Sequence, residues 1–76
     1  MRPVIHWEFT RGTERVICQV ERDATSGAFA VALVACRGLR RASIGTFQAV
    51  AAALRRHAAV ANELRSAGWK LAAYTR

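Results

Sequence analysis

The side chains of this sequence with the greatest potential for binding chemistry are its arginines. Twelve Lys and Arg stand against five Asp and Glu, which gives a net charge of +7, and eleven of the twelve cations are Arg. Guanidinium groups bind phosphate through paired hydrogen bonds, so clustered Arg favours contact with nucleic acid. The alternative is charge scattered for solubility, because charge alone does not locate a site. The residues expected to contact nucleic acid are Arg11, Arg15, Arg37, Arg40 and Arg41.

A second set of side chains could bind a metal or transfer a proton. His6 and Glu8 alternate along an expected strand, and Glu21 is their diagonal neighbour on the next one. That face is expected to be solvated, and the sequence offers no further ligand. An ordinary polar sheet face is therefore the favoured interpretation, and no metal is expected.

Cys18 and His57 are the remaining candidates for catalysis. They could act as nucleophile and base, but the sequence shows no third group to orient the base. Cys18 and Cys36 lack the spacing of a zinc site and are expected on opposite faces of a sheet, so neither zinc nor a disulfide is expected. Single glycines form no phosphate-binding loop. The sequence therefore predicts a protein that is not an enzyme and needs no cofactor.

Alternating apolar residues predict the strands that position these side chains. Residues 4–10 and 16–21 alternate about a hairpin loop at 11–14, and a β-rich apolar run over 28–36 follows a turn at 23–27. A shorter fourth strand is expected over 39–44, after the turn that Arg37 and Gly38 begin. Its Ala42 and Ile44 should face the core.

The strand register can be tested by asking whether the large apolar residues share one face of the sheet, because a slip of one residue sends every side chain to the other face. Pairing Thr10 with Arg15, and Asp23 with Ala28, places the large apolar residues of both hairpins on the same side. The resulting apolar face holds Ile5, Trp7, Phe9, Val16, Cys18, Val20, Phe29, Val31 and Leu33. Because its rings are turned inward, base stacking on an open sheet is not expected, and nucleic acid would be bound mainly through phosphate and shape.

The spacing of apolar residues changes to that of a helix over residues 47–67. Thr46 is the expected N-cap and Gly68 the expected C-cap, and His57 lies at the flank of the apolar stripe. The residues expected to pack on the sheet are Phe47, Val50, Ala51, Leu54, Ala58, Ala61 and Leu64. Residues 69–74 alternate again, which predicts a short extended segment that returns along the sheet or reaches a partner.

These elements predict one small α+β domain over residues 1–76. It is a three- to four-stranded antiparallel β-meander with one long C-terminal helix across one face, followed by a short extended tail or strand. A chain of this length buries little surface, so a homo-oligomer or a protein partner is expected. The contact is expected on the outer face of the sheet, which is unusually apolar, at Ile17, Ala30, Ala32 and Val34.

Two classes of function stay open. The first is an accessory or regulatory protein that binds nucleic acid, and the second is a protein-interaction module that forms a homodimer or docks to an acidic partner; composition does not separate them. The apolar run at 28–36 is too short to cross a bilayer, and the first residues lack the apolar stretch of a secretory signal. No membrane association and a cytoplasmic location are therefore expected.

Overall fold

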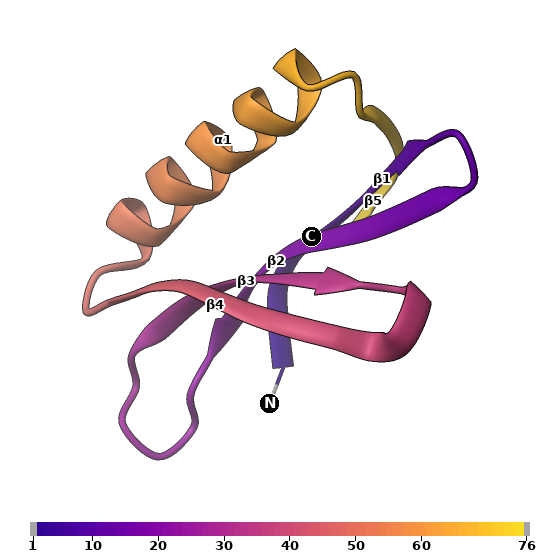
Figure 1. Ribbon diagram of the computed structural model, residues 1–76. Helices are drawn as coiled ribbons and strands as arrows, with labels where there is room; N and C mark the ends of the chain where they lie inside the picture. Colours follow the sequence, from indigo (N-terminus) through magenta and orange to yellow (C-terminus); the bar gives the residue numbers. More distant parts are fainter. Residues whose placement is uncertain (1, 76) are drawn as a thin grey trace.

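The computed structural model describes the backbone of residues 2–75 and the side chains of residues 4–38 and 40–74. It has two layers, a five-stranded antiparallel sheet and one helix packed across one face, while the outer face is open (Figure 1). The strand order is β4-β3-β2-β1-β5. The elements are β1 (Arg2–Arg11), β2 (Glu14–Arg22), β3 (Phe29–Ala35), the short 3-10 helix η1 (Arg37–Leu39), β4 (Arg40–Phe47), α1 (Val50–Ser66) and β5 (Lys70–Thr75).

The fold class predicted from the sequence is confirmed, with a higher strand count. The extra strand is β5, which leaves the helix through Gly68 at a positive φ of 93° and pairs with β1, so that Tyr74 lies opposite Trp7. Of the two paths expected for residues 69–74, the return along the sheet is the one adopted. Pairing with β1 satisfies backbone groups that would otherwise form a bare sheet edge.

The predicted strand register is confirmed in both hairpins. Phe9 lies opposite Val16 and Trp7 opposite Cys18, and Cys18 in turn lies opposite Leu33. Phe9 and Cys18 have no exposed surface. Burial of the large apolar side chains on one face therefore sets the strand pairing, because apolar and polar residues alternate along each strand.

The core divides into two clusters because α1 crosses the sheet obliquely. The N-terminal half of α1 places Ala53 against Val20 and Val31, with ring contacts from β3 and β4. The C-terminal half places Val60 and Ala61 against Phe9, towards β1 and β5. The helix thus runs from the β4 side of the sheet to its β5 side (Figure 1).

The predicted start and buried face of the helix are partly wrong. Phe47 and Thr46 are still in β4, opposite Phe29 and Ala30, so α1 begins only at Val50 and Thr46 is not its cap. The predicted stripe is wrong at three positions: Val50 is 40% exposed, and Ala51 and Ala58 are exposed too. Its other members, Phe47, Leu54, Ala61 and Leu64, pack in the core as predicted. The buried residues are Ala53, His57, Val60 and Ala61. Alanine lies all around this helix, so its apolar pattern constrains the rotation only weakly.

Paired alanine substitutions in α1 test this rotation of the helix. Ala53→Leu should lower the free energy of unfolding by about 1–3 kcal/mol, because Ala53 is fully enclosed and extra methylenes cannot be accommodated. The matched variant Ala51→Leu should change it by less than about 0.5 kcal/mol. Urea unfolding measures both, and equal losses would contradict the helix orientation described.

Candidate functional site

Several of the predicted nucleic-acid contacts lie at one end of the sheet. The β1–β2 hairpin loop, η1 and the C-terminus of α1 lie towards this end, with η1 below the hairpin loop at the right of Figure 1. Arg11 lies opposite Glu14, Arg40 lies opposite Ala35, and the carbonyl of Arg15 accepts a hydrogen bond of 3.1 Å from Cys36. We call this the basic end, defined by Arg11, Arg15, Arg37, Arg40 and Lys70.

Lys70 is the member of the basic end that sequence reasoning missed. It begins β5 and lies opposite Thr10, one residue from Arg11. The alternation of residues 69–74 was the available signal, but it did not fix the edge at which the segment pairs. Lys70 therefore joins the other four cations only through the tertiary fold.

Two of these arginines contact carboxylates on the surface. Arg11 pairs with Glu14 at 3.3 Å and Arg15 pairs with Glu8. Such exposed pairs contribute at most about 1 kcal/mol and leave the cations accessible. Within residues 4–38 and 40–74, Arg37 and Arg40 form no ion pair, and both are exposed. Their charge is therefore not neutralised by any neighbouring carboxylate among those residues.

Arg11 also stabilises the helix end. Its guanidinium lies 4.5 Å from the centre of the Trp69 ring and donates a hydrogen bond of 3.2 Å to the carbonyl of Ala67. That carbonyl lies at the negative end of the α1 dipole. Arg11 thus lowers the negative potential that α1 would otherwise place at the basic end.

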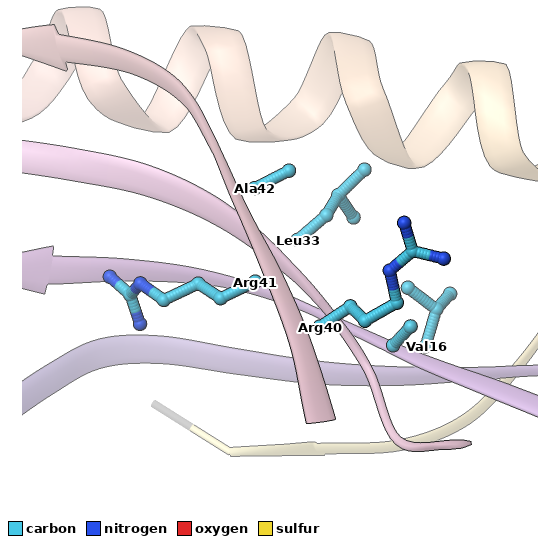
Figure 2. Close-up of a pocket in the computed structure, with 6 residues that line it drawn as sticks. Val16, Leu33, Arg40, Arg41 and Ala42 are labelled. Atoms are coloured by element: carbon cyan, nitrogen blue, oxygen red, sulfur yellow. The ribbon is translucent and has the colours of Figure 1, made fainter. Parts of the chain in front are cut away.

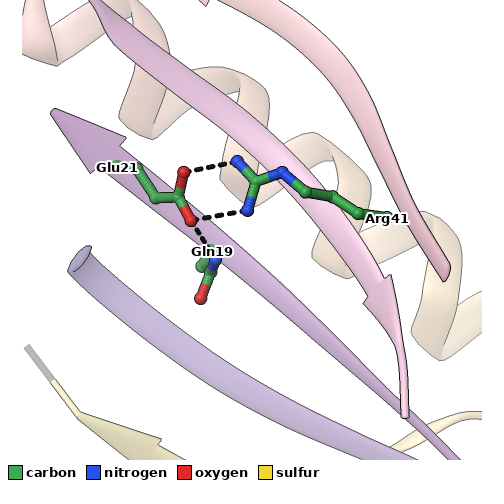
Figure 3. A network of polar contacts seen from close by, with 3 residues as sticks. All are labelled: Gln19, Glu21 and Arg41. Carbon is green, nitrogen blue, oxygen red and sulfur yellow. Dashed lines mark hydrogen bonds and ion pairs between the residues drawn. The ribbon is translucent and has the colours of Figure 1, made fainter. Parts of the chain in front are cut away.

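Arg41, the fifth predicted contact, follows Arg40 in β4 but points to the outer face of the sheet, as Arg15 does. It forms two hydrogen bonds with Glu21, one of them at 2.7 Å, and Gln19 donates to the same carboxylate (Figure 3). The Glu21 side chain is only 7% exposed, and the Arg41 hydrogen bonds hold the pKa of Glu21 below its usual value. Arg41 is therefore occupied within the fold and does not belong to the basic end.

The same ion pair changes the predicted interface strip on the outer face. Ala32 lies opposite Gln19, between the positions of Glu21 and Arg41, and has no exposed surface. Ala30, Ile17 and Val34 keep partial exposure, and Ile17 lies directly opposite Val34. The strip is thus interrupted at Ala32. The sequence placed these residues on one face but did not reveal which cation would reach across them.

Removing the cation of this pair tests its structural role. Arg41→Ala should lower the free energy of unfolding by about 1–3 kcal/mol, because Glu21 is left almost covered without its charged partner. Arg37→Ala, a matched removal of an exposed guanidinium, should cost less than about 0.5 kcal/mol. Urea unfolding of both variants makes the comparison, and an Arg41→Ala protein as stable as Arg37→Ala would contradict the assignment.

A hollow opens at the basic end on the helix side of the sheet. Two adjoining cavities of about 420 Å³ and about 310 Å³ share Val16, Leu33 and Ala35. Arg40 points to this side with Leu33 and Ala42, whereas Arg41 points away (Figure 2). We call this hollow the corner groove. The larger cavity is also lined by Arg41, whose side chain turns to the outer face, and the smaller one by Glu14, Arg15, Arg37, Leu64 and Trp69.

His57 and Cys18 contact each other without forming a nucleophile and base. The Nε2 of His57 donates to the backbone carbonyl of Cys18 at 3.1 Å, and the imidazole packs edge-on against Trp7. Burial raises the pKa of the Cys18 thiol to about 11, so it is protonated at neutral pH. His57 is thus buried at the flank of the helix, and its hydrogen bond fastens α1 to β2.

The structure also places the two cysteines and the carboxylates that were weighed as disulfide or metal-binding residues. Cys18 and Cys36 are free thiols. Glu8 and Glu21 pair with arginines, and the described residues contain no group of three His, Cys, Asp or Glu side chains that could hold a metal ion. The described chain likewise has no helix that is both long and apolar enough to cross a membrane.

The buried imidazole predicts a loss of stability in acid. Burial lowers the pKa of His57 below the value of about 6.5 in the unfolded chain, so the unfolded chain binds a proton first as the pH falls. The free energy of unfolding should therefore fall below about pH 6.5. His57→Gln should be less stable at neutral pH than the wild type but show a smaller further loss in acid. Urea unfolding from about pH 7 to about pH 5 distinguishes these outcomes.

The fold and the site define a two-layer α+β protein with an open outer sheet face and a cationic end. No family model, curated protein or solved structure matches the chain. Its function is therefore inferred from the geometry of its own residues.

Proposed function

We propose that this protein is a binding module, not an enzyme, that binds nucleic acid through phosphate contacts at the basic end and acts as an accessory or regulatory protein. The observation that carries the proposal is the convergence of Arg11, Arg15, Arg37, Arg40 and Lys70 from four strands and η1. A cluster of cations at one end raises the local concentration of a polyanion more than the same charges spread evenly.

The two arginines of the cluster without a described carboxylate partner support phosphate binding most directly. Arg37 and Arg40 flank the start of β4, and both are exposed. A guanidinium can present two parallel N–H donors to phosphate oxygens. Arg15 would exchange a weak surface pair for phosphate contacts at little cost, whereas Arg11 would also have to give up its contacts with Trp69 and the Ala67 carbonyl or share them with the phosphate.

The position of the aromatic rings supports binding without strong sequence preference. Phe9 is fully buried, and Trp7 packs between His57 and Tyr74 on the helix side of the sheet. The outer face of the sheet therefore offers no aromatic platform among its described residues. Phosphate contacts then carry the affinity, and it should depend strongly on salt.

A protein-interaction module is the second candidate function. Ile17 and Val34 lie opposite each other on the outer face and are only half-buried. They form the largest aliphatic contact in the predicted strip, and a homodimer could cover them. A stoichiometric protein complex without affinity for nucleic acid would favour this function over the first.

A salt titration with matched double variants tests nucleic-acid binding. Wild-type affinity for a short DNA duplex should fall steeply as salt rises, and Arg37→Gln/Arg40→Gln should reduce the slope by about 0.9 for each phosphate that the variant no longer neutralises. Arg22→Gln/Arg55→Gln removes the same charge away from the basic end and should change the slope much less. Fluorescence anisotropy reports the affinities, and sedimentation of the free protein reports its oligomeric state.

Two results would overturn the proposal. One is the absence of duplex and single-strand binding at low salt. The other is an equal reduction in both double variants, which would show that net charge acts without a localised site. A concentration-independent monomer in sedimentation would count against the homodimer.

A further inference from the structure

We infer that the corner groove is a binding site for a small aliphatic carboxylate, whose tail lies on Val16, Leu33 and Ala35 and whose carboxylate is bound by Arg40, with Arg37 in the adjoining cavity. The inference goes beyond nucleic-acid binding and does not require it. It rests on the shape, the lining and the charge of the groove, each of which follows from the fold.

The groove exists because the helix crosses the sheet obliquely. Ala53 at the start of α1 covers β2 and β3, and Leu64 near its end packs with the cluster around Phe9. The corner of β3 and β4 at the basic end therefore has no helix above it. Ala42, which faces this side opposite Leu33, is exposed for the same reason.

The lining and size of the groove fit a small amphipathic molecule. Its floor is aliphatic, and Leu64 and Trp69 form the wall nearest the helix. The cavities of about 310 Å³ and about 420 Å³ lie at the lower end of the volumes that hold organic ligands. Apolar walls with few polar groups at the rim are typical of such sites.

Charge complementarity at the rim selects an anion. Arg37 lines one cavity and Arg40 the other, and neither has a carboxylate partner among the described side chains. Glu14 lines the same cavity as Arg37 and pairs with Arg11. A carboxylate in the cavity that Arg40 lines keeps away from Glu14 and can accept hydrogen bonds from the Arg40 guanidinium, while Arg37 in the adjoining cavity adds to the positive potential.

Two other occupants fit the groove less well. A second copy of the chain would have to bring Glu63 beside an apolar side chain, because Glu8, Glu14 and Glu21 pair within the fold and Asp23 bonds within its own turn. The exposed residues next to Glu63 on α1 are Ala59, Asn62 and Ser66, which are too small or too polar to fill an aliphatic groove. A nucleobase would present hydrogen-bonding edges to the aliphatic floor, where they would give up water without finding partners.

A titration with simple acids tests the assignment. Octanoate should bind saturably and shift the backbone amide signals of Val16, Leu33 and Ala35 in two-dimensional NMR spectra. Acetate has the same head without the tail, 1-octanol has a matched tail without the charge, and both should bind at least about tenfold more weakly. Across butanoate, hexanoate and octanoate, the affinity should rise by up to about fourfold for each added methylene.

Variants at the groove provide the matched controls. Arg40→Gln should weaken octanoate by about tenfold, whereas Arg22→Gln should not. Ala35→Leu should fill the groove and abolish binding, whereas Ala30→Leu, on the outer face of the same strand, should leave it unchanged. Unfolding curves of both leucine variants show whether each remains folded.

The outcomes separate this site from the proposed nucleic-acid site. Ala35→Leu fills the groove, so it should abolish octanoate binding. Because it removes no charge, it should leave the salt-dependent affinity for DNA intact. Equal affinities for octanoate, octanol and acetate, shifts away from the groove, or no octanoate binding at millimolar concentration would each overturn the inference. None of these results would change the outcome of the DNA titration.

Discussion

The constraint on which the rest of the structure depends is the pairing register of β1, β2 and β3. It brings Phe9, Cys18, Val20 and Val31 to one face, where each is fully buried. A single helix can cover that face, so Trp7, Phe9 and Phe29 lie in the core or at its margin, while Tyr74 is 64% exposed beside Trp7. The outer face is left to aliphatic, polar and charged side chains. Both proposed binding sites lie at the end of the sheet where Arg37 and Arg40 have no carboxylate partner among the described side chains.

The oblique packing of α1 links stability to binding. Its first half is fixed by Ala53 over β2 and β3, and its second half by Val60 and Ala61 over β1 and β2. His57 lies between them and bonds to the sheet backbone. One helix of this length cannot cover a twisted five-stranded sheet completely, and the uncovered corner becomes the groove. The same geometry brings the helix C-terminus beside Arg11, where a cation stabilises it.

The few carboxylates of the chain determine where its positive charge remains available. Glu21 binds Arg41 on the outer face, and Asp23 accepts hydrogen bonds from Thr25 and Ser26 within its own turn. Glu8 and Glu14 pair with arginines near the hairpin. The excess positive charge at Arg37 and Arg40 therefore depends on which arginines have a carboxylate partner as well as on the number of cations. Local pairing, and not net charge alone, defines the basic end.

The sequence by itself determined the strands, the turns, the register of the two hairpins and the inward position of the rings, because alternation with period two is local and a slip inverts every side chain. Only the tertiary structure decided the edge at which β5 pairs, the rotation of an alanine-rich helix, and the bridge from Arg41 to Glu21 across Ala32. The path of β5 depends on which sheet edge is free, and the helix rotation depends on the shape of the sheet beneath it. The reach of Arg41 depends on its position opposite Val34 in the pairing of β3 with β4. These are long-range relations that no local repeat encodes. The corner groove, which follows from the oblique crossing of the helix, therefore could not be read from the chain.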